Sequence, residues 1–300
     1  MKASRRIAAA LCCAAIASCG PGQGTEGPFF VSVEAEAVPL TPLGAIVTVV
    51  TSGECGIEIE YSSAAAGAGP FTTPRTGSGT VHAVDVAWMR PDTTYSLVAV
   101  AYLADGSVRR AAAIEFRTGA LPATIPDFEV TVTDAAGVQP GVTIVAPTAR
   151  QGGEPLAVVP YIGVDEQGEI VWYHEVALPA GVHVNPFARP VPGMGIMIVT
   201  PEGLRVVGVL GETVAEVSAS DAGAISFHHE GIVLDGGGWL TMTGEERVVG
   251  TPDLGTITAL GDVILELEAD GSVRWEWHAF DHLDTDRFPG PLSRSEDPTG

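Results

Sequence analysis

Two groups of histidines are the residues of this sequence best suited to chemistry. His228 and His229 stand together at the start of an apolar run, and His278 and His282 stand among aspartates. A neutral imidazole can act as a nucleophile, and imidazole N–H groups can stabilise negative charge in a transition state. Because successive strand residues face opposite sides, we expect one of the first pair to face a polar site and the other to pack between sheets. A single histidine of this kind is more often structural than catalytic.

Other catalytic signatures are absent from the sequence. It contains no G-x-S-x-G elbow, phosphate loop, dinucleotide fingerprint or H-E-x-x-H zinc helix. Gly236-Gly237-Gly238 lies between two apolar runs and is interpreted as a hairpin turn. Residues 278–287 offer oxygen and nitrogen atoms to a metal, but their spacing fits no calcium loop, so a solvated loop is expected. We therefore expect neither a metal nor a cofactor.

Short apolar runs separated by Gly, Pro and Asp must position these histidines. This pattern is typical of an all-β protein, and the 37 Gly and 22 Pro of the chain agree with it. Alternation of apolar and polar residues predicts a small sandwich over residues 29–119. Its expected strands are 30–34, 45–51, 56–61, 80–86, 94–102 and 111–117.

One turn in this first domain carries a more specific signal. An apolar strand follows the run Trp88-Met89-Arg90-Pro91-Asp92-Thr93-Thr94-Tyr95. The run resembles the corner of a fibronectin type III domain, and in such sandwiches the tyrosine bonds back to the preceding corner. The resemblance implies a fibronectin type III-like sandwich that serves as a spacer or interaction module. Residues 120–126, punctuated by proline, are the expected linker to the next domain.

Beyond the linker, one motif recurs: an apolar residue, an acidic turn, Gly, a strand and Trp. It is clearest at 164–172 and 267–275, and 199–207 is a weaker copy. Repeated units of this kind predict a β-propeller, and a plain series of hairpins is the alternative. A propeller needs roughly four to eight blades, and residues 127–300 have room for about three or four. We therefore expect an incomplete propeller that belongs to a longer protein.

The N-terminus has the features of an exported lipoprotein. A basic start precedes the apolar run 7–17, which is shorter than the roughly 20 residues that span a bilayer. The run ends in Ile16-Ala17-Ser18-Cys19, which matches the bacterial lipobox, so Cys19 is the expected lipidation site. Residues 1–19 would be the signal peptide and 20–28 a flexible tether. An ordinary cleaved signal peptide is the alternative.

Charge and cysteine content fit this compartment. The formal charge of −22 becomes −25 once the three basic residues of the signal are removed, and so acidic a surface repels nucleic acid and anionic lipid. Membrane attachment must then come from the lipid. Gly20 favours the outer membrane, with the protein facing the periplasm or the cell surface. Cys55 alone remains in the mature chain, so we expect no disulfide and a buried thiol.

The order of the motifs resembles the bacterial arylsulfate sulfotransferase family over residues 120–290. The resemblance rests on Gly168-x-Ile170-Val171-Trp172-Tyr173, on His228-His229-Glu230-Gly231-Ile232 with Gly237-Gly238, and on Gly271-x-Val273-x-Trp275-x-Trp277 with Asp281-His282-Leu283-Asp284. It implies transfer of a sulfuryl group from an aryl sulfate to a phenol without a nucleotide donor. It also implies a propeller funnel lined by His and Arg, and a sulfohistidine intermediate.

Residue by residue, the resemblance covers only part of such a site. His229 or His228 matches an early histidine that binds and stabilises charge, and we favour His229 because an acid, Glu230, follows it. Asp281, His282 and Asp284 match a family signature and receive no catalytic role. The nucleophilic histidine and its partners are expected beyond residue 300, so the chain as given is expected to be inactive.

Two other functions fit the sequence. One is a non-enzymatic surface lipoprotein whose sandwich and propeller bind a ligand or a protein partner. The other is a quinone-dependent or other propeller enzyme, because such blades also carry Trp and Gly motifs. The oligomeric state is left open.

Overall fold

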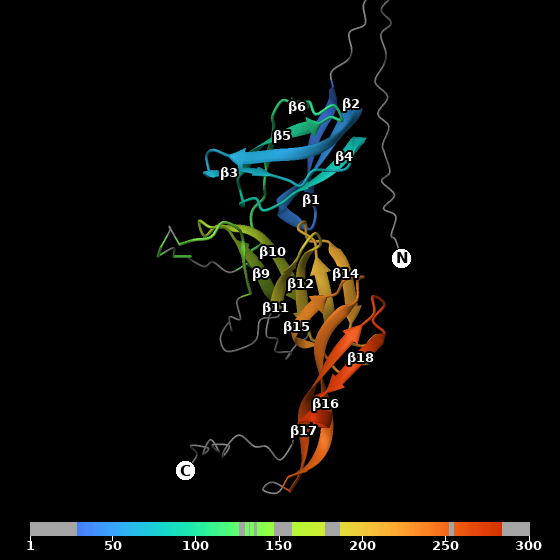
Figure 1. The fold of residues 1–300 in the computed structure, drawn as a ribbon. Helices are drawn as coiled ribbons and strands as arrows, with labels where there is room; N and C mark the ends of the chain where they lie inside the picture. The colour runs from blue at the N-terminus through green and yellow to red at the C-terminus, as the bar shows by residue number, and fades with distance from the viewer. Residues whose placement is uncertain are drawn as a thin grey trace, which may run out of the picture.

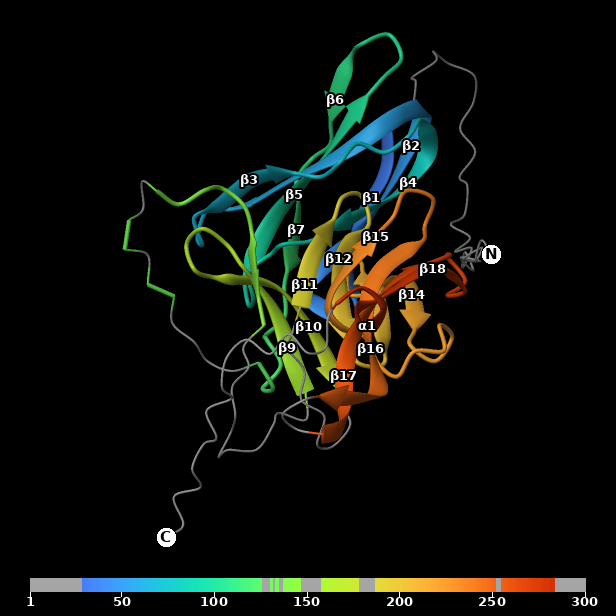
Figure 2. The same cartoon turned by 60° about the horizontal axis from the view of Figure 1, so that its bottom comes forward.

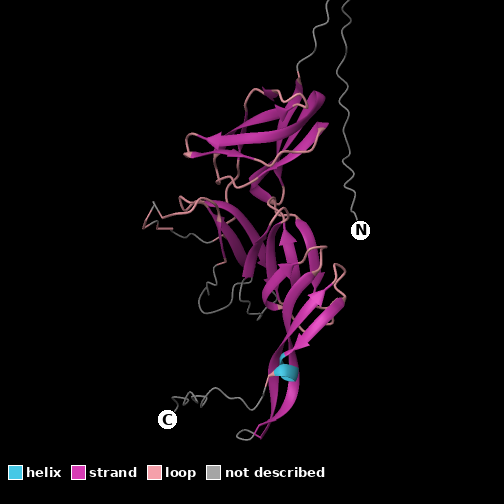
Figure 3. Ribbon diagram, viewed as in Figure 1, coloured by secondary structure: helices cyan, strands magenta, loops and turns pink. Residues whose placement is uncertain are grey.

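Nearly all of the regular secondary structure in the computed structural model is β-strand (Figure 1 and Figure 3), as the sequence predicted. The structure describes residues 29–125, 130–131, 133–134, 137–146, 158–177, 187–251 and 255–283. The one helix in these ranges is the single turn α1 (Ala279–His282). None of the described residues forms a helix long and apolar enough to cross a bilayer.

The first domain is a seven-stranded antiparallel assembly in which the long strand β2 (Thr41–Ser63) belongs to two layers. The first half of β2 pairs with β1 (Phe30–Val38) and β4 (Gly79–Val86). The second half pairs with β3 (Ala68–Thr72) and β5 (Thr94–Tyr102). Strands β6 (Val108–Arg110) and β7 (Ile114–Arg117) complete the second layer beside β5. Side chains of both layers share one apolar core, which therefore holds the two layers together.

The boundaries of four predicted strands were wrong, and β1 continues to Val38, beyond the predicted end at residue 34. The sequence predicted separate strands at 45–51 and 56–61, but β2 continues through residues 52–55, and a register shift against β4 between Val50 and Cys55 marks the irregularity. Glycine can mark a bulge in a strand that does not end there, and Gly53 and Gly56 lie in this irregular part of β2. Cys55 is buried, as predicted. The predicted strand at 111–117 is shorter and is preceded by β6, and β3 was not predicted.

The corner before β5 is closed by hydrogen bonds. The backbone N–H of Arg90 donates to Tyr95 Oη at 2.9 Å, which is the back-bond expected for this tyrosine. Thr118 Oγ1 donates to the carbonyl of Arg90 at 2.6 Å. Tyr95 is fully buried, and desolvation raises the pKa of its hydroxyl. Trp88 has a φ of 61°, uncommon for a non-glycine residue. This corner fixes the place from which the Arg90 side chain leaves the sandwich.

The chain then forms three antiparallel sheets in sequence order. The first contains β8 (Thr143–Val145), β9 (Val158–Val164) and β10 (Ile170–Ala177). The second contains β11 (Phe187–Val191), β12 (Gly195–Thr200), β13 (Gly203–Val207) and β14 (Thr213–Ser218). The third contains β15 (His228–Val233), β16 (Trp239–Thr251), β17 (Gly255–Leu267) and β18 (Val273–His278). Each of the last two sheets is a four-stranded meander, which is the topology of the predicted propeller blades.

The second sheet lies between the first and the third (Figure 1 and Figure 2). Its two faces are both buried because alternate residues point to opposite sides. Towards the first sheet, Ile196, Ile198 and Val207 pack against Tyr161 and Trp172. Towards the third sheet, the packed residues are Met197, Val199, Leu204, Val206 and Val217 on the second sheet and Trp239, Val263, Leu265 and Leu267 on the third.

One turn geometry explains the sequence repeat. In turns 165–169, 208–212 and 268–272, the first N–H donates to the fifth carbonyl, and the fourth N–H donates to the first carbonyl. The fourth residues, Gly168, Gly211 and Gly271, have φ values of 90°, 90° and 87°, which glycine adopts without steric cost. Each turn joins the last two strands of its sheet, and the same bonding also closes turns 103–107 in the sandwich and 234–238 between β15 and β16.

The weaker third copy of the motif was placed wrongly. Gly203 follows the tight turn between β12 and β13, whereas the structural equivalent of Gly168 and Gly271 is Gly211. Residues 209–210, Val-Leu, lack the acidic residues of the other two turns. The equivalence of the 208–212 turn to the other two turns is therefore visible only in its backbone hydrogen bonds and in the φ of Gly211.

The sandwich is attached directly to the first sheet. The Arg90 guanidinium lies 2.7 Å from the Asp165 carboxylate, with side chains only 11% and 15% exposed. It also donates to the side-chain oxygen of Gln167 at 2.7 Å. Leu43 of β2 packs with Ile162 and other apolar residues of the first sheet. The predicted linker contributes Leu121 and Ile125 to the same cluster, so this segment forms part of the interface.

Candidate functional site

The predicted histidine pair lies at an irregular start of β15. Pairing with β16 shifts register between His228 and Gly231, and His229 has a φ of 63°. The two imidazole rings are perpendicular, at 88°, with centroids 4.9 Å apart. Bulges re-aim side chains and are enriched beside active sites, and a non-glycine residue in this backbone region costs about 1–3 kcal/mol. The bulge therefore changes the direction of the two side chains and leaves His229 in a strained backbone conformation.

The two imidazoles have different environments. His229 is exposed, as is its neighbour Glu230. The side chain of His228 is 29% exposed, and its Nε2 lies 3.8 Å from Asp262 Oδ1. Its Nδ1 is inaccessible to solvent and has no hydrogen-bond partner among the described residues. Thr241 Oγ1 donates to the Glu230 carbonyl at 3.0 Å and ties the bulge to β16. One histidine thus faces solvent and the other is half-buried.

His228 shares the outer face of the third sheet with an apolar row. This face, directed away from the second sheet, is defined here by Ile232, Leu240, Met242, Ile264, Trp275 and Trp277. Cross-strand pairing places His228 opposite Met242. Among the described residues this face is incompletely covered, because Trp275 remains 48% exposed and Ile232 36% exposed.

The second histidine group is a structural network in the described residues. The sequence predicted a solvated loop at 278–287, but His278 ends β18 and Asp281 lies in α1. His278 Nδ1 lies 3.2 Å from Glu245 Oε1, and Arg247 Nη1 lies 2.8 Å from Asp281 Oδ1. His282 stacks on Trp277, with ring centroids 4.9 Å apart and planes inclined by 5°.

His278 of the second group does not join His228 and His229 in one site. Trp277 shares the face of His228, so its neighbour His278 points to the opposite face of the sheet. No group of three or more His, Cys, Asp or Glu side chains placed to hold a metal occurs in the described part of the chain. Asp284 lies outside the described residues, as do Cys19, the signal peptide and the tether.

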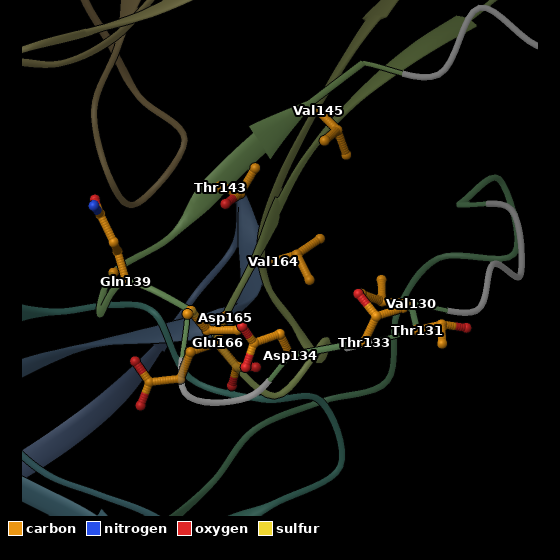
Figure 4. Close-up of a pocket in the computed structure, with 13 residues that line it drawn as sticks. Val130, Thr131, Thr133, Asp134, Gln139, Thr143, Val145, Val164, Asp165 and Glu166 are labelled. Atoms are coloured by element: carbon orange, nitrogen blue, oxygen red, sulfur yellow. The ribbon is translucent and has the colours of Figure 1, made fainter.

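Two cavities are lined by residues other than the predicted pair. The first, of about 600 Å³, lies between the described residues of the segment that precedes β8 and the end of β9, and Figure 4 shows residues that line it. Asp134, Asp165 and Glu166 gather at one end of it and Val145 lies at the other. Asp165 is already engaged by Arg90 of the sandwich. All of its lining residues lie between Val130 and Glu166, so the cavity belongs to the part of the chain that follows the sandwich.

The second cavity, of about 690 Å³, lies between β10 and the second sheet. Its polar lining includes His174 and Arg205, which sequence reasoning did not select. Burial lowers the pKa of His174, and the charge of Arg205 lowers it further. The available signal was the position of His174, two residues after Trp172, because strand periodicity then directs it to the same side as that core residue.

Residues 152–296 match the family model described as Arylsulfotransferase (ASST). No curated protein matches the chain. Among solved structures, the crystal structure of a protein of unknown function from Bacteroides caccae covers 86% of this chain and 95% of its own, with 12% identity and a TM-score of 0.25. That similarity is too low to support an argument about fold or function. The part of the chain that extends from β9 to α1 thus matches the arylsulfotransferase (ASST) family, as its motifs predicted.

Proposed function

We propose that this chain is part of an exported sulfuryl transferase in which His229 and His228 bind the sulfuryl group as it moves from an aryl sulfate to a phenol. The match of residues 152–296 to the arylsulfotransferase family supports this reaction class. The structural observation that carries the proposal is the bulge at the start of β15. It exposes His229 beside a half-buried His228 whose Nδ1 has no partner among the described residues.

The chemistry suits imidazole. In sulfuryl transfer a nucleophile attacks sulfur, the bond from sulfur to the aryl oxygen breaks, and the phenolate leaves. N–H donors stabilise the sulfuryl oxygens and the departing oxygen. The formal charge of −22 opposes the approach of an anionic aryl sulfate, so local donors must hold it. We assign this binding role to His229, with His228 beside it, and leave nucleophilic attack to another histidine of the complete protein.

We further propose that additional sheets complete the site. Trp172 is 1% exposed because the second sheet covers it, whereas Trp275, at the same place in the repeated motif, is 48% exposed. The apolar outer face of the third sheet is suited to packing another sheet about 10 Å away. On this proposal such sheets supply the nucleophilic histidine and the arginine, and the 300-residue chain alone is inactive.

The lipid anchor is a separate part of the proposal. We infer that Cys19 receives lipid and that the protein is held at the outer membrane, facing the periplasm or the cell surface. The support is the lipobox sequence and the acidic mature chain. Metabolic labelling with a fatty acid in a bacterial host should mark the unmodified chain, whereas Cys19→Ala should abolish the label. Persistent labelling of Cys19→Ala would contradict this assignment.

The site is tested with the purified 300-residue chain, 4-nitrophenyl sulfate and phenol. We expect no release of nitrophenol, together with aryl sulfate binding, measured by calorimetry, that weakens about tenfold in His229→Asn through loss of a charged hydrogen bond. His278→Asn is the matched control, because that imidazole faces the opposite side of the sheet.

The alternative outcomes have distinct meanings. Turnover that disappears in His229→Ala would overturn the claim that the site is incomplete. Absence of aryl sulfate binding would overturn the role of His229 and favour the non-enzymatic lipoprotein.

A further inference from the structure

The hairpin of β16 and β17 extends beyond the other strands of the third sheet. The two strands pair with each other over their whole length of 13 residues. In contrast, β15 pairs with β16 only as far as Met242, and β18 reaches β17 only at Val263. Residues 244–251 and 255–261, called the arm here, therefore form a two-stranded ribbon that projects from the sheet (Figure 1). A ribbon of two strands alone is marginally stable in water.

One side of the arm is supported at its base by α1. Phe280 of α1 lies directly against Gly261, where a Cβ would overlap the ring. The Arg247 guanidinium lies over the same ring, 5.0 Å from its centroid. The other side of the ribbon continues the outer face of the third sheet, and there Val248 and Leu260 are 68% and 73% exposed. The arm thus presents apolar side chains to solvent on the side that α1 does not support.

The edge of β17 in the arm differs from the other sheet edges. Its residues 255–261, Gly-Thr-Ile-Thr-Ala-Leu-Gly, include no charged residue and no proline, whereas the opposite edge of the arm carries Glu245, Glu246 and Arg247. Proteins protect edge strands with charges, proline or short length, because their unpaired N–H and C=O groups otherwise accept another strand. The other described edge strands of four or more residues each contain a charged residue or a proline: β1, β3, β4, β7, β10, β11, β14, β15 and β18. Among the described edges of this length, that of β17 in the arm alone lacks such protection.

We propose that this edge pairs with the same edge of a second copy of the chain, β17 against β17, antiparallel about a two-fold axis at Thr258. Such a contact is self-complementary, because the same residues serve both partners. It places Thr256 opposite Leu260 of the second copy, and Ile257 opposite Ala259. Like charges directly opposite each other would destabilise the pairing, and this stretch of β17 brings none together.

The charge of the chain favours this place for the contact. A formal charge of −22 makes two copies repel each other. The uncharged stretch lies on a projection, so the two backbones can meet there while the acidic bodies stay apart. Pairing joins two ribbons into one four-stranded sheet, in which Val248 and Leu260 of both copies share a face. Three or more strands with an apolar face are stable where a lone hairpin is not.

The pairing is tested on the 300-residue chain by sedimentation equilibrium and by amide hydrogen exchange. We expect a weak dimer whose fraction rises with protein concentration, because the paired segment is short. Over the same concentration range, exchange of the amides of residues 256–260 should slow, while exchange of the amides of β18 should stay constant. A chain that remains monomeric at about 1 mM, or protection that arises at β18 instead, would overturn the proposal.

A charge placed at the two-fold axis locates the contact. Thr258→Lys sets two ammonium groups opposite each other and should weaken the dimer at least about tenfold. The same change makes the chain less acidic, so general repulsion between the copies falls and does not account for the loss. Thr213→Lys is the matched control, because it adds an equal charge at an exposed threonine of the edge strand β14, and it should leave the dimer intact. Equal effects of the two variants would overturn the assignment of the contact to β17.

Discussion

Trp172 and Trp275 occupy the same place in two copies of one motif, yet their environments differ. Each tryptophan follows a turn glycine, Gly168 or Gly271, on the last strand of its sheet. Trp172 is 1% exposed and packs against the second sheet, whereas Trp275 is 48% exposed. The motif therefore determines a position within a sheet. Burial at that position depends on whether another sheet lies on that face.

The largest expected effect comes from truncating the two tryptophans. Trp172→Ala should lower the free energy of unfolding by about 3–5 kcal/mol, because it leaves a cavity between two packed sheets. Trp275→Ala should cost less than about 1 kcal/mol. Guanidinium unfolding followed by circular dichroism measures both losses. Equal losses would show that Trp275 is already covered and would remove the contrast between the two faces.

The next effect concerns the other side of the first sheet, where the sandwich attaches. Arg90→Ala should cost about 3 kcal/mol, since it leaves the nearly buried carboxylate of Asp165 without its cationic partner. Arg110→Ala is the matched control, because its pair with Glu60 is much more exposed and such pairs contribute little. The same unfolding measurement applies. A loss for Arg90→Ala no greater than the control would mean that the sandwich and the first sheet are held mainly by apolar contacts.

A smaller effect should appear on the outer face of the third sheet. Trp275→Glu should reduce the binding of an apolar dye and the self-association of the 300-residue chain about twofold, because exposed apolar patches promote both. Val81→Glu changes a side chain of similar exposure on the sandwich, 67%, and should alter neither. Dye fluorescence and sedimentation velocity provide the measurements. If both variants behave alike, the outer face is not a special surface.

The smallest effect is the pH dependence of the last strand. Partial burial alone would lower the pKa of His278, but the carboxylates of Glu245 and Glu276 more than offset this and raise it above its ordinary value. Because the pKa is higher in the folded state, this contribution to stability is complete below the unfolded pKa and is lost as pH rises through the folded one. The stability of the unmodified chain relative to His278→Gln should therefore grow from pH 8.5 to pH 5.5. If this difference in stability did not change with pH, the carboxylates of Glu245 and Glu276 would not raise the pKa of His278 in the folded chain.

Local patterns predicted much of the fold. Alternation and turn residues are local, so β5 was predicted at its observed bounds and the turn at 236–238 was recognised. Gly211 was missed because its equivalence to Gly168 rests on backbone conformation, while the neighbouring residue types differ. The single strand β2 was missed because only pairing with β1, β4 and β5 shows that residues 52–55 continue it.

The candidate sites show the same division. Strand periodicity was sufficient to expect different surroundings for His228 and His229, but the bulge that produces them depends on pairing with β16. His174 was missed because its importance depends on Arg205 and on an unfilled space between two sheets. The sequence shows that a histidine is present, but only the packed structure shows that its Nε2 has no hydrogen-bond partner among the described residues.

The attachment of the sandwich gives the stack of sheets a direction. Leu43 of the sandwich and the segment with Leu121 and Ile125 cover the side of the first sheet that carries Ile162 and Tyr173. The end of the array at the first sheet is therefore covered, and any further sheet would pack on the opposite end, against the third sheet. A ring built from this array would have an asymmetric seam, where its closing sheet shares the face of the first sheet with residues of the sandwich and the linker.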